Sequence, residues 1–334
     1  MKPKSCFLIS RTTSLASAML TAVWLVGLTG GPVGAAETGD LARLRERALA
    51  LVNEARGRNG LEPLELGPDL NEAAQAHARD MLERVYYAHV SPEGDTVANR
   101  YSEAGGSRWK LVAENIARCL GCGAPPQVPR VEALHEGWMN SPPHRENILA
   151  RGLGRFGFGI IVGPDQRLYA VQTFAGAGIP RGLQPGEEPR PLSAEEQVAL
   201  ALQAVNRARA QVGVSPLERS PPLIEAARNL LRPLPQAAAQ SPDASGFQLS
   251  GRILDAIPSD AREDWRSVGV IAASCGGCGV ERTAADVRSF FGQWLEDGQY
   301  RERLTAADVT HLGFAMWTNG EGRKVAVSTL GLKR

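Results

Sequence analysis

The sequence has no excess of charge of either sign. Lys and Arg together number 37, and Asp and Glu number 36, among 334 residues. This balance indicates neither a nucleic acid nor an anionic membrane as a partner. The 43% of hydrophobic residues is instead typical of a globular protein, and the length allows two domains with cores of their own.

Beyond its first 35 residues the chain also lacks any apolar run long enough to cross a bilayer, which takes about 20 residues. The run at 15–28 follows a positively charged start and precedes small residues, a pattern typical of a signal peptide cleaved near Ala35/Ala36. An uncleaved anchor is the alternative, whereas Cys6 precedes the run and so does not suit a lipoprotein. We expect residues 1–35 to be removed and the mature chain, without a membrane span, to be secreted into the periplasm or the medium.

The two halves of the chain repeat one pattern in register. The matching pairs include Asn53 and Asn206, Arg56 and Arg209, Trp138 and Trp294, and Gly157 and Gly313. The period is too long for a solenoid of short repeats, so we interpret it as a tandem domain duplication. We place the domains at 41–178 and 193–334, joined by a linker at 179–192 whose prolines and glycines cannot continue a helix or a strand ladder.

The first copy combines helical and strand patterns. Apolar residues recur at helical spacing in 41–55, 69–81 and 131–138. Residues 157–162 and 168–174 are apolar, β-branched and aromatic, and the Gly-Pro-Asp-Gln sequence between them predicts a β-hairpin. Helices first and antiparallel strands last are typical of an α+β domain with helices packed on a sheet, and the second copy repeats this ending.

Histidine is scarce, and four of the five histidines lie in the first copy. His77 shares a helical face with apolar residues, and the second copy has Leu230 at that place and Phe291 in place of His135. Because an apolar replacement suits a packed position, we interpret both histidines as core residues rather than as ligands.

His89 and His144 lie in loops marked by Ser-Pro, Gly-Asp and Pro-Pro sequences. Loop histidines held by a rigid scaffold are often functional, although exposed histidines without a function are also common. Glu114 stands beside Asn115 in a mostly apolar stretch. Its carboxylate therefore either faces a cleft or accepts hydrogen bonds from local backbone N–H groups, and the spacing leaves both open.

The first copy resembles a known family of proteins. The strings AHVSPEGD, AENIA, GWMNSPPHRENIL and GFGIIVGPDQRLYAVQTF are similar to the bacterial branch of the CAP superfamily, which contains cysteine-rich secretory proteins, venom allergens and plant pathogenesis-related proteins. The resemblance spans about residues 45–176, and the second half resembles a degenerate copy. It implies a three-layer αβα sandwich with a cleft, in agreement with the helix and hairpin patterns.

The resemblance also implies a set of cleft residues. The family's cleft carries two histidines and two glutamates, and His89, Glu114 and His144 match three of these positions. The second glutamate of the family falls three residues after the tryptophan, where this chain has Ser141. Glu136 is the alternative, but at about 100° per residue it points about 140° away from the apolar stripe of its helix, whereas Ser141 lies nearer to that stripe.

Two imidazoles and a carboxylate are the ligands of some zinc hydrolases, which keep a fourth position for water. On this pattern His89 and His144 would bind a divalent metal with Glu114 beside them, zinc being the first candidate, although imidazole suits other divalent metals too. The alternative is a polar cluster that only bonds the surrounding loops. No HExxH motif or evident general base completes a hydrolytic site, and nothing visible orients His144 to activate Ser141 as a nucleophile.

The second copy has lost these polar residues. The replacements are Val270 for Glu114, Ile271 for Asn115, Gly292 for Glu136 and Tyr300 for His144, and His89 has no counterpart. The second domain is therefore expected to keep the fold without the chemistry, and either to dock on the first domain or to present a binding surface.

Four cysteines remain after the signal peptide, as two CxxC pairs at equivalent places. Four thiolates could bind zinc. An oxidising compartment and the duplication favour two local disulfides instead, Cys119–Cys122 and Cys275–Cys278. A redox-active pair is disfavoured because neither pair opens a helix after a strand.

The resemblance implies a function without choosing a ligand, because CAP relatives are linked to lipids or sterols, to peptides or proteins, and to divalent metals. Our leading hypothesis is an exported, non-enzymatic binding protein that takes one of these ligands in the cleft of its first domain. The alternative is a metal-dependent hydrolase that uses His89, Glu114 and His144.

Overall fold

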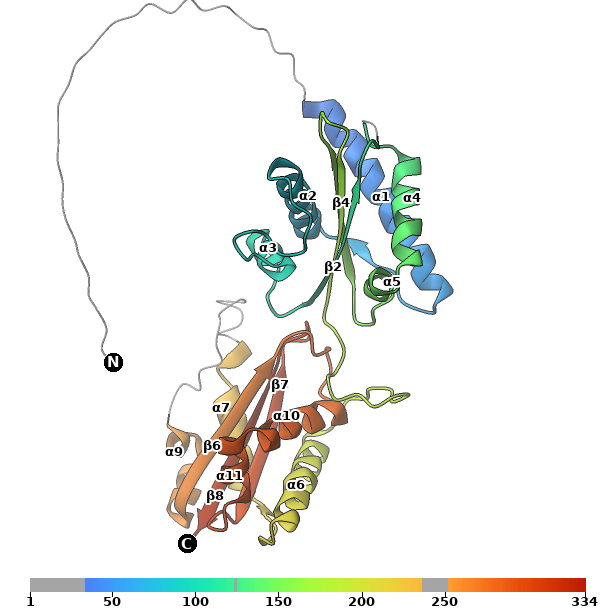
Figure 1. Cartoon of the computed structure of the whole chain (residues 1–334). Coiled ribbons are helices and arrows are strands. Elements are labelled where there is room, and N and C mark those ends of the chain that lie inside the picture. Colours follow the sequence, from blue (N-terminus) through green and yellow to red (C-terminus); the bar gives the residue numbers. More distant parts are fainter. Residues whose placement is uncertain (1–33, 123–124, 236–251) are drawn as a thin grey trace, which may run out of the picture. The chain divides into compact units, whose positions relative to one another are not determined.

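The computed structural model describes residues 34–122, 125–235 and 252–334 (Figure 1). The predicted signal peptide falls almost wholly on residues outside these ranges. Within them, none of the helices combines the length and apolar character that a membrane span requires.

The first copy is a four-stranded sheet between two layers of helices (Figure 1). Its elements in chain order are α1 (Gly34–Arg58), β1 (Glu65–Leu66), α2 (Pro68–Glu83), α3 (Val97–Glu103), β2 (Leu111–Cys119), α4 (Val128–Asn140), α5 (Pro142–Ile148), β3 (Arg155–Val162) and β4 (Leu168–Gly176). The strand order is β1-β3-β4-β2, with β1 parallel to β3 and the other pairs antiparallel. The predicted αβα sandwich and the β3–β4 hairpin are confirmed.

The alternation of side chains along the strands separates two cores. Phe158 and Phe174 pack with Trp138 under α1 and α4, whereas Ile116 and Val171 pack under α2. Helix α2 lies directly on the backbone of β3, because a Cβ atom built on Gly157 would come within 2.2 Å of the backbone of Leu70. The matching Gly313 meets the backbone of Leu223 at the same 2.2 Å, which explains why both copies have glycine there.

The second copy repeats the architecture. Its elements are α6 (Ala194–Gln211), β5 (Glu218–Arg219), α7 (Pro221–Leu231), α9 (Ile253–Ala256), the 3-10 helix η1 (Ser259–Asp264), β6 (Trp265–Cys275), α10 (Ala284–Glu296), α11 (Gly298–Thr305), β7 (His311–Thr318) and β8 (Lys324–Lys333). The strand order β5-β7-β8-β6 is that of the first sheet, which confirms two tandem copies of one fold. Between β4 and α6, where we expect the linker, the chain forms no helix and no strand.

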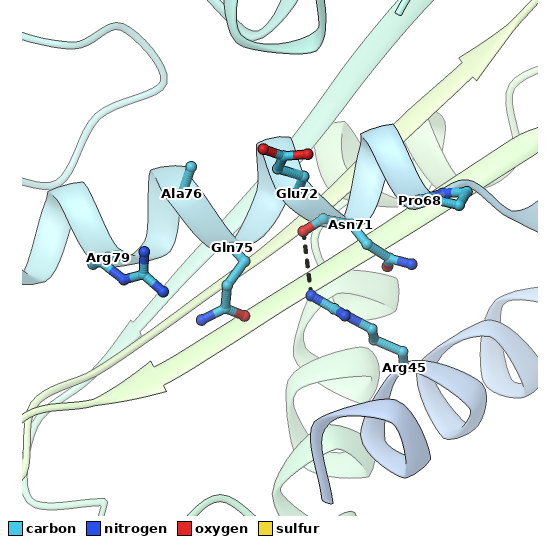
Figure 2. Close-up of a pocket in the computed structure, with 7 residues that line it drawn as sticks. All are labelled: Arg45, Pro68, Asn71, Glu72, Gln75, Ala76 and Arg79. Carbon is cyan, nitrogen blue, oxygen red and sulfur yellow. Dashed lines mark hydrogen bonds between the residues drawn. The ribbon is translucent and has the colours of Figure 1, made fainter. Parts of the chain in front are cut away.

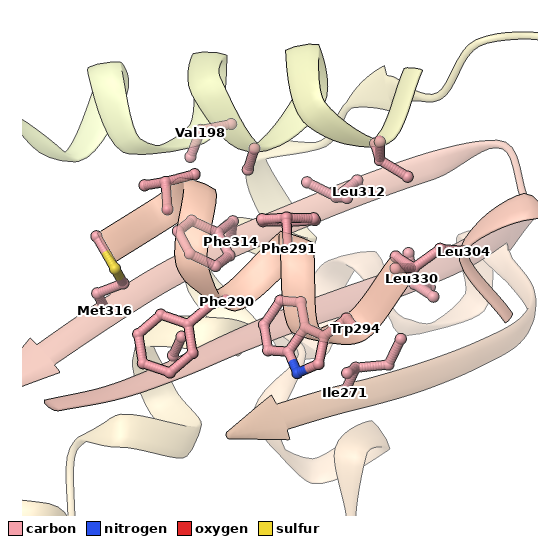
Figure 3. Close-up of a cluster of buried hydrophobic side chains, with 14 of the residues drawn as sticks. Val198, Ile271, Phe290, Phe291, Trp294, Leu304, Leu312, Phe314, Met316 and Leu330 are labelled. Carbon is pink, nitrogen blue, oxygen red and sulfur yellow. The ribbon is translucent and has the colours of Figure 1, made fainter. Parts of the chain in front are cut away.

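Aromatic side chains fill the core of the second copy (Figure 3). Phe291 packs its ring 5.0 Å from that of Trp294 and 5.3 Å from that of Phe314, measured between centroids. Phe291 replaces His135 of the first copy, and both side chains are buried. The prediction that His135 is a packed position is confirmed.

Some buried polar residues have the same structural task in both copies. Arg56 donates from Nη1 to the carbonyls of Ile148 and Ala150, each at 2.9 Å, and so anchors the end of α5. Arg209 anchors the end of α11 with the same two bonds at 2.9 Å, to the carbonyls of Leu304 and Ala306. These arginines belong to the scaffold of the fold.

The strand registers show that equivalent residues occupy the same position in the two sheets. Glu114 lies opposite Thr173 in the first sheet, and Val270 lies opposite Thr329 in the second. The replacement of Glu114 by Val270 is therefore confirmed in three dimensions. Disulfides join Cys119 to Cys122 and Cys275 to Cys278, as predicted, so the thiols are used in pairs within each copy.

Candidate functional site

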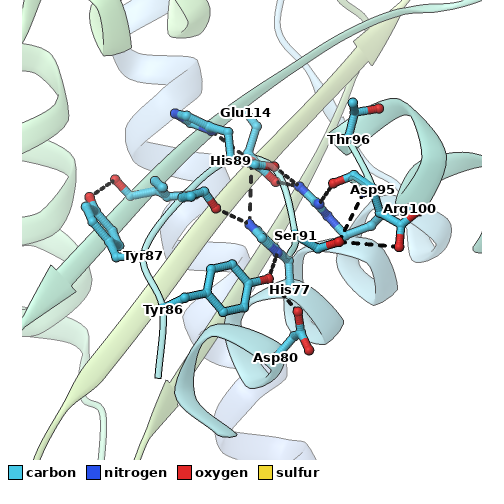
Figure 4. Close-up of polar contacts among 12 residues, drawn as sticks. His77, Asp80, Tyr86, Tyr87, His89, Ser91, Asp95, Thr96, Arg100 and Glu114 are labelled. Atoms are coloured by element: carbon cyan, nitrogen blue, oxygen red, sulfur yellow. Dashed lines mark hydrogen bonds and ion pairs between the residues drawn. The ribbon is translucent and has the colours of Figure 1, made fainter. Parts of the chain in front are cut away.

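Glu114 is a buried carboxylate on the edge strand β2 (Figure 4). Its side chain is only 2% exposed, and its Oε2 atom accepts a hydrogen bond from Nη2 of Arg100 at 2.8 Å. Its Oε1 atom lies 2.9 Å from Nδ1 of His89 and 3.8 Å from Nε2 of His77. The carboxylate thus bonds side chains rather than the local backbone, which answers the question that the sequence left open.

Arg100 connects the carboxylate to the loop that carries His89. It lies on the short helix α3, which begins with a capping box formed by Thr96 and Asn99. Besides Glu114, its guanidinium donates to the carbonyl of His89 at 3.0 Å and to that of Asp95 at 2.8 Å. The sequence analysis missed Arg100, because nothing in the chain connects it to a partner fourteen positions away.

The contact with Glu114 determines the tautomer of His89. A carboxylate paired with an arginine can only accept hydrogen bonds, so Nδ1 of His89 carries the proton and donates it. The neutral ring then has its lone pair on Nε2. Since the side chain is 52% exposed, this nitrogen is available to a ligand.

His77 supports the same loop from below (Figure 4). Its ring is fully buried, as predicted for a core position, and burial lowers its pKa. Because Nε2 lies 3.1 Å from the carbonyl of Ala88, this nitrogen donates to the backbone immediately before His89. The interpretation as a core residue is confirmed, but the polar contacts of the ring were not predicted.

Tyr86 and Asp80, both half-buried, extend this cluster on the side of His77. The hydroxyl of Tyr86 donates to the carboxylate of Asp80 and lies 3.4 Å from Nδ1 of His77. Burial, followed by the hydrogen bond to Asp80, raises the pKa of Tyr86 to about 12. The hydroxyl therefore stays protonated at physiological pH and acts as a fixed donor.

His144 lies on helix α5, so the prediction that it lies in a loop is wrong: Pro142 and Pro143 occupy the first helical positions and start a new helix. Its side chain is half-buried, and burial lowers its pKa, with a smaller contribution from the charge of nearby His89. Its backbone carbonyl accepts a hydrogen bond from Nδ2 of Asn115 at 3.1 Å. The ring of His144 is thus neutral at physiological pH and offers a lone pair.

Ser141 and Glu136 are less well placed. Ser141 is half-buried at the junction of α4 and α5, and its side chain does not cap α5. Glu136 is exposed on α4, as its helical angle predicted, while the preceding His135 is buried. Among the described residues, no hydrogen bond or ion pair joins either side chain to His89, Glu114 or His144.

The carboxylate of Glu114 is bonded by side chains of the protein itself. In the part of the chain that the structure describes, no cluster of three or more His, Cys, Asp or Glu side chains is suited to hold a metal ion. Each oxygen of Glu114 has one partner, Arg100 at Oε2 and His89 at Oε1. The metal candidates are then the two imidazoles, His89 and His144.

A cavity of about 480 Å³ lies elsewhere in the first copy, along α2 (Figure 2). Its lining side chains include Arg45, Asn71 and Gln75. Asn71 accepts from the amide of Phe158 at 2.9 Å, and Arg45 donates to the carbonyl of the same residue at 3.0 Å. Gln75 makes the equivalent pair of bonds to Ile160, at 3.1 and 3.2 Å. These polar groups seal the edge of β3, which the short β1 leaves without a partner strand, and so are not free for a ligand.

Comparisons with known proteins agree with the fold. The model of the cysteine-rich secretory protein family, CAP, matches residues 49–174 and 202–330. The uncharacterized protein YkwD of Bacillus subtilis is 32% identical over 116 residues, which cover 35% of this chain and 42% of that protein. The uncharacterized membrane protein YlbC of the same organism is 32% identical over 129 residues, which cover 39% of this chain and 33% of that protein. The match thus spans less than half of each relative.

Solved structures include a similar extracellular protein with an SCP domain from Bacillus anthracis. It is 27% identical to this chain, with a TM-score of 0.34, and the match covers 43% of this chain and 44% of that one.

Proposed function

The chain belongs to the cysteine-rich secretory protein (CAP) family in both of its halves, and on that premise we propose that it is an exported, non-enzymatic binding protein whose first domain binds a divalent metal ion through His89 and His144. The observation that carries the proposal is the Glu114–His89 pair. Histidines that bind metals usually donate their second ring N–H to a carboxylate or a carbonyl, which fixes the ring and directs the other nitrogen at the metal. His89 has this arrangement, with Nδ1 on Glu114 and a side chain that is 52% exposed.

The electrostatic setting of the two rings supports the same proposal. His144 is neutral at physiological pH because burial lowers its pKa, so binding a cation does not require the removal of a proton. The charge of Glu114 is balanced by Arg100, which keeps the carboxylate from competing as a ligand. Two imidazoles leave coordination positions for water or for a donor group of a further ligand, and imidazole suits zinc among the divalent metals.

The other ligands that the family resemblance implies, a lipid or sterol and a peptide, gain less support from the site itself. Its described side chains are polar, and the cavity along α2 is lined by groups that already bond β3. The alternative of a metal-dependent hydrolase gains no support either. Glu114 would have to serve as third ligand or general base, and both of its oxygens are engaged.

Export is part of the proposal. The disulfides within the two copies support it, because such bonds persist mainly in oxidising compartments outside the cytosol. The charged start and apolar run of the first 35 residues support it from the sequence.

Calorimetric titration of zinc into the metal-free protein tests the proposal. We expect one site in the wild type and an affinity loss of more than about tenfold in both His89→Ala and His144→Ala. The matched control is His311→Ala, which removes a histidine of the second domain and leaves the binding unchanged. Equal zinc affinity in the wild type and the two site variants, or no binding at all, would overturn the proposal.

A further inference from the structure

A comparison of the two copies distinguishes side chains that the fold requires from side chains that the site requires. Arg56 and Arg209 make the same hydrogen bonds in both copies, so they belong to the scaffold. A buried polar residue that the second copy has replaced, although the fold persists, is not required by the fold. It then needs another explanation.

Three buried or half-buried amides of the first copy fall in this class. Asn115 on β2 donates from Nδ2 to Oε1 of Gln172 on β4 at 3.0 Å. Asn147 on α5 donates from Nδ2 to Oδ1 of Asn115 at 2.9 Å and to the carbonyl of Glu114 at 3.0 Å. The second copy has Ile271, Arg303 and Ser328 at these places.

Docking of α5 on the sheet does not explain the cluster. In both copies the end of this helix is held by the buried arginine, and α11 of the second copy packs without any of the three amides. In the first copy the amides act on the other end of the helix, because Asn115 also donates to the carbonyl of His144 at 3.1 Å. Asn147 meanwhile fixes the backbone of Glu114.

We infer that Asn115, Asn147 and Gln172 are positioning residues that hold the backbone of His144 on α5 in register with Glu114 on β2. The inference rests on the proposed binding function of this site. The amides do not touch the ligand. They fix the separation between the His89–Glu114 pair and the second imidazole, because they bond α5 to β2 and β2 to β4, whereas Arg56 bonds the end of α5 to α1.

A second observation favours a positioning role of the three amides over a purely stabilising role. Nε2 of Gln172 is buried and has no hydrogen-bond partner among the described residues, so the cluster is not arranged to satisfy all of its own polar groups. The amide cluster instead bonds the backbone carbonyls of two site residues, His144 and Glu114.

The test uses the full chain with the substitutions Asn115→Ile and Gln172→Ser made together. This variant has the residue pair that the second copy already accommodates, Ile271 and Ser328, so we expect it to fold. Zinc affinity should fall by about tenfold or more, as for other groups that orient metal ligands. Hydrogen exchange of the metal-free protein should become about tenfold faster at the amides of residues 145–147, with that of α4 unchanged.

Two further variants keep the test decisive. Asn147→Ala removes the bonds to Asn115 and Glu114 at a less buried position, and it replaces the double variant if that variant does not fold. It should also lower the zinc affinity and speed up hydrogen exchange at residues 145–147. Asn53→Ala removes a scaffold side chain, bonded to Leu64 as Asn206 is to Leu217. It should lower the melting temperature and leave the zinc affinity of the folded protein unchanged.

The outcomes separate the two proposals. If the wild type binds zinc and the amide variants bind it equally well, the positioning role is wrong and the binding function stands. If the wild type does not bind zinc, the binding function is wrong, and hydrogen exchange of α5 alone decides whether the amides position His144. Unchanged exchange would then overturn the positioning role.

Discussion

Arg100 and Glu114 form a buried ion pair in which Nη2 of the arginine lies 2.8 Å from Oε2 of the carboxylate, with side chains 10% and 2% exposed. Burying either charge alone is costly, whereas the pair, with its further hydrogen bonds to the loop, is tolerated inside a protein. This ion pair therefore fixes the loop around His89 to the sheet.

Replacement of Arg100 tests the importance of the pair. In Arg100→Met the carboxylate of Glu114 stays buried without its countercharge, and we expect the free energy of unfolding to fall by about 3–5 kcal/mol. Urea denaturation of the full chain measures this loss. The control is Arg84→Met, because Arg84 pairs with Asp80 and Glu93 at the surface, where ion pairs contribute little. A loss no larger than that of the control would show that the charge of Glu114 is balanced by other groups.

The buried histidines predict how stability depends on pH. Burial lowers the pKa of His77 below its ordinary value of 6.5, so the folded ring stays neutral while the unfolded ring takes up a proton. Protons therefore favour unfolding: the stability is fully present above pH 6.5 and decreases as the pH falls below that value. His135 contributes in the same direction, since burial lowers its pKa too.

Melting temperatures between about pH 7.5 and 5.5 check this prediction. His77→Leu and His135→Phe, which introduce the residues of the second copy, should each flatten the pH dependence. A wild-type melting temperature that does not fall over this range, or variants with the same slope as the wild type, would contradict it.

The disulfide of the first copy gives a prediction about both stability and zinc. Cys119 and Cys122 are three positions apart, so their bond closes a very short loop and the chain-entropy gain is about 2 kcal/mol. Cys119→Ser/Cys122→Ser should lose about that much unfolding free energy in denaturant titrations. The zinc stoichiometry should stay the same, because the thiols are paired with each other. A lost zinc equivalent would instead favour a thiolate site.

Local periodicity made α1, α2, α4 and the hairpin predictable, whereas the short helices α3 and α5 were not predicted. Trp138 and Trp294 align the two copies with each other. The apolar stripes around them are visible in the local sequence, without knowledge of any distant contact. The helical angle of Glu136 also predicted its exposure correctly. Strand β2 was not predicted, because its sequence does not alternate between apolar and polar residues. It has a buried carboxylate, Glu114, on one face and a buried amide, Asn115, on the other.

The site was predictable only in part for a related reason. The resemblance located His89, Glu114 and His144, but pairing between Glu114 and Arg100 arises from tertiary folding and leaves no periodic trace in the sequence. The amides Asn115, Asn147 and Gln172 could have been found by asking which polar residues disappear together in the second copy. The replacement of Asn115 by Ile271 is visible in the sequence, but the hydrogen bonds that give Asn115 its role appear only in the structure.

The side chains that seal β3 have a consequence for the ageing of this protein. Gln75 bonds both the amide and the carbonyl of Ile160, much as a neighbouring peptide group would, and Asn71 and Arg45 share this task at Phe158. Slow deamidation of Gln75 would replace its N–H donor by a carboxylate oxygen facing a carbonyl oxygen. The carbonyl of Ile160 would then be an unpaired acceptor on the strand edge, and unpaired backbone groups on an edge are the starting point for intermolecular β-pairing.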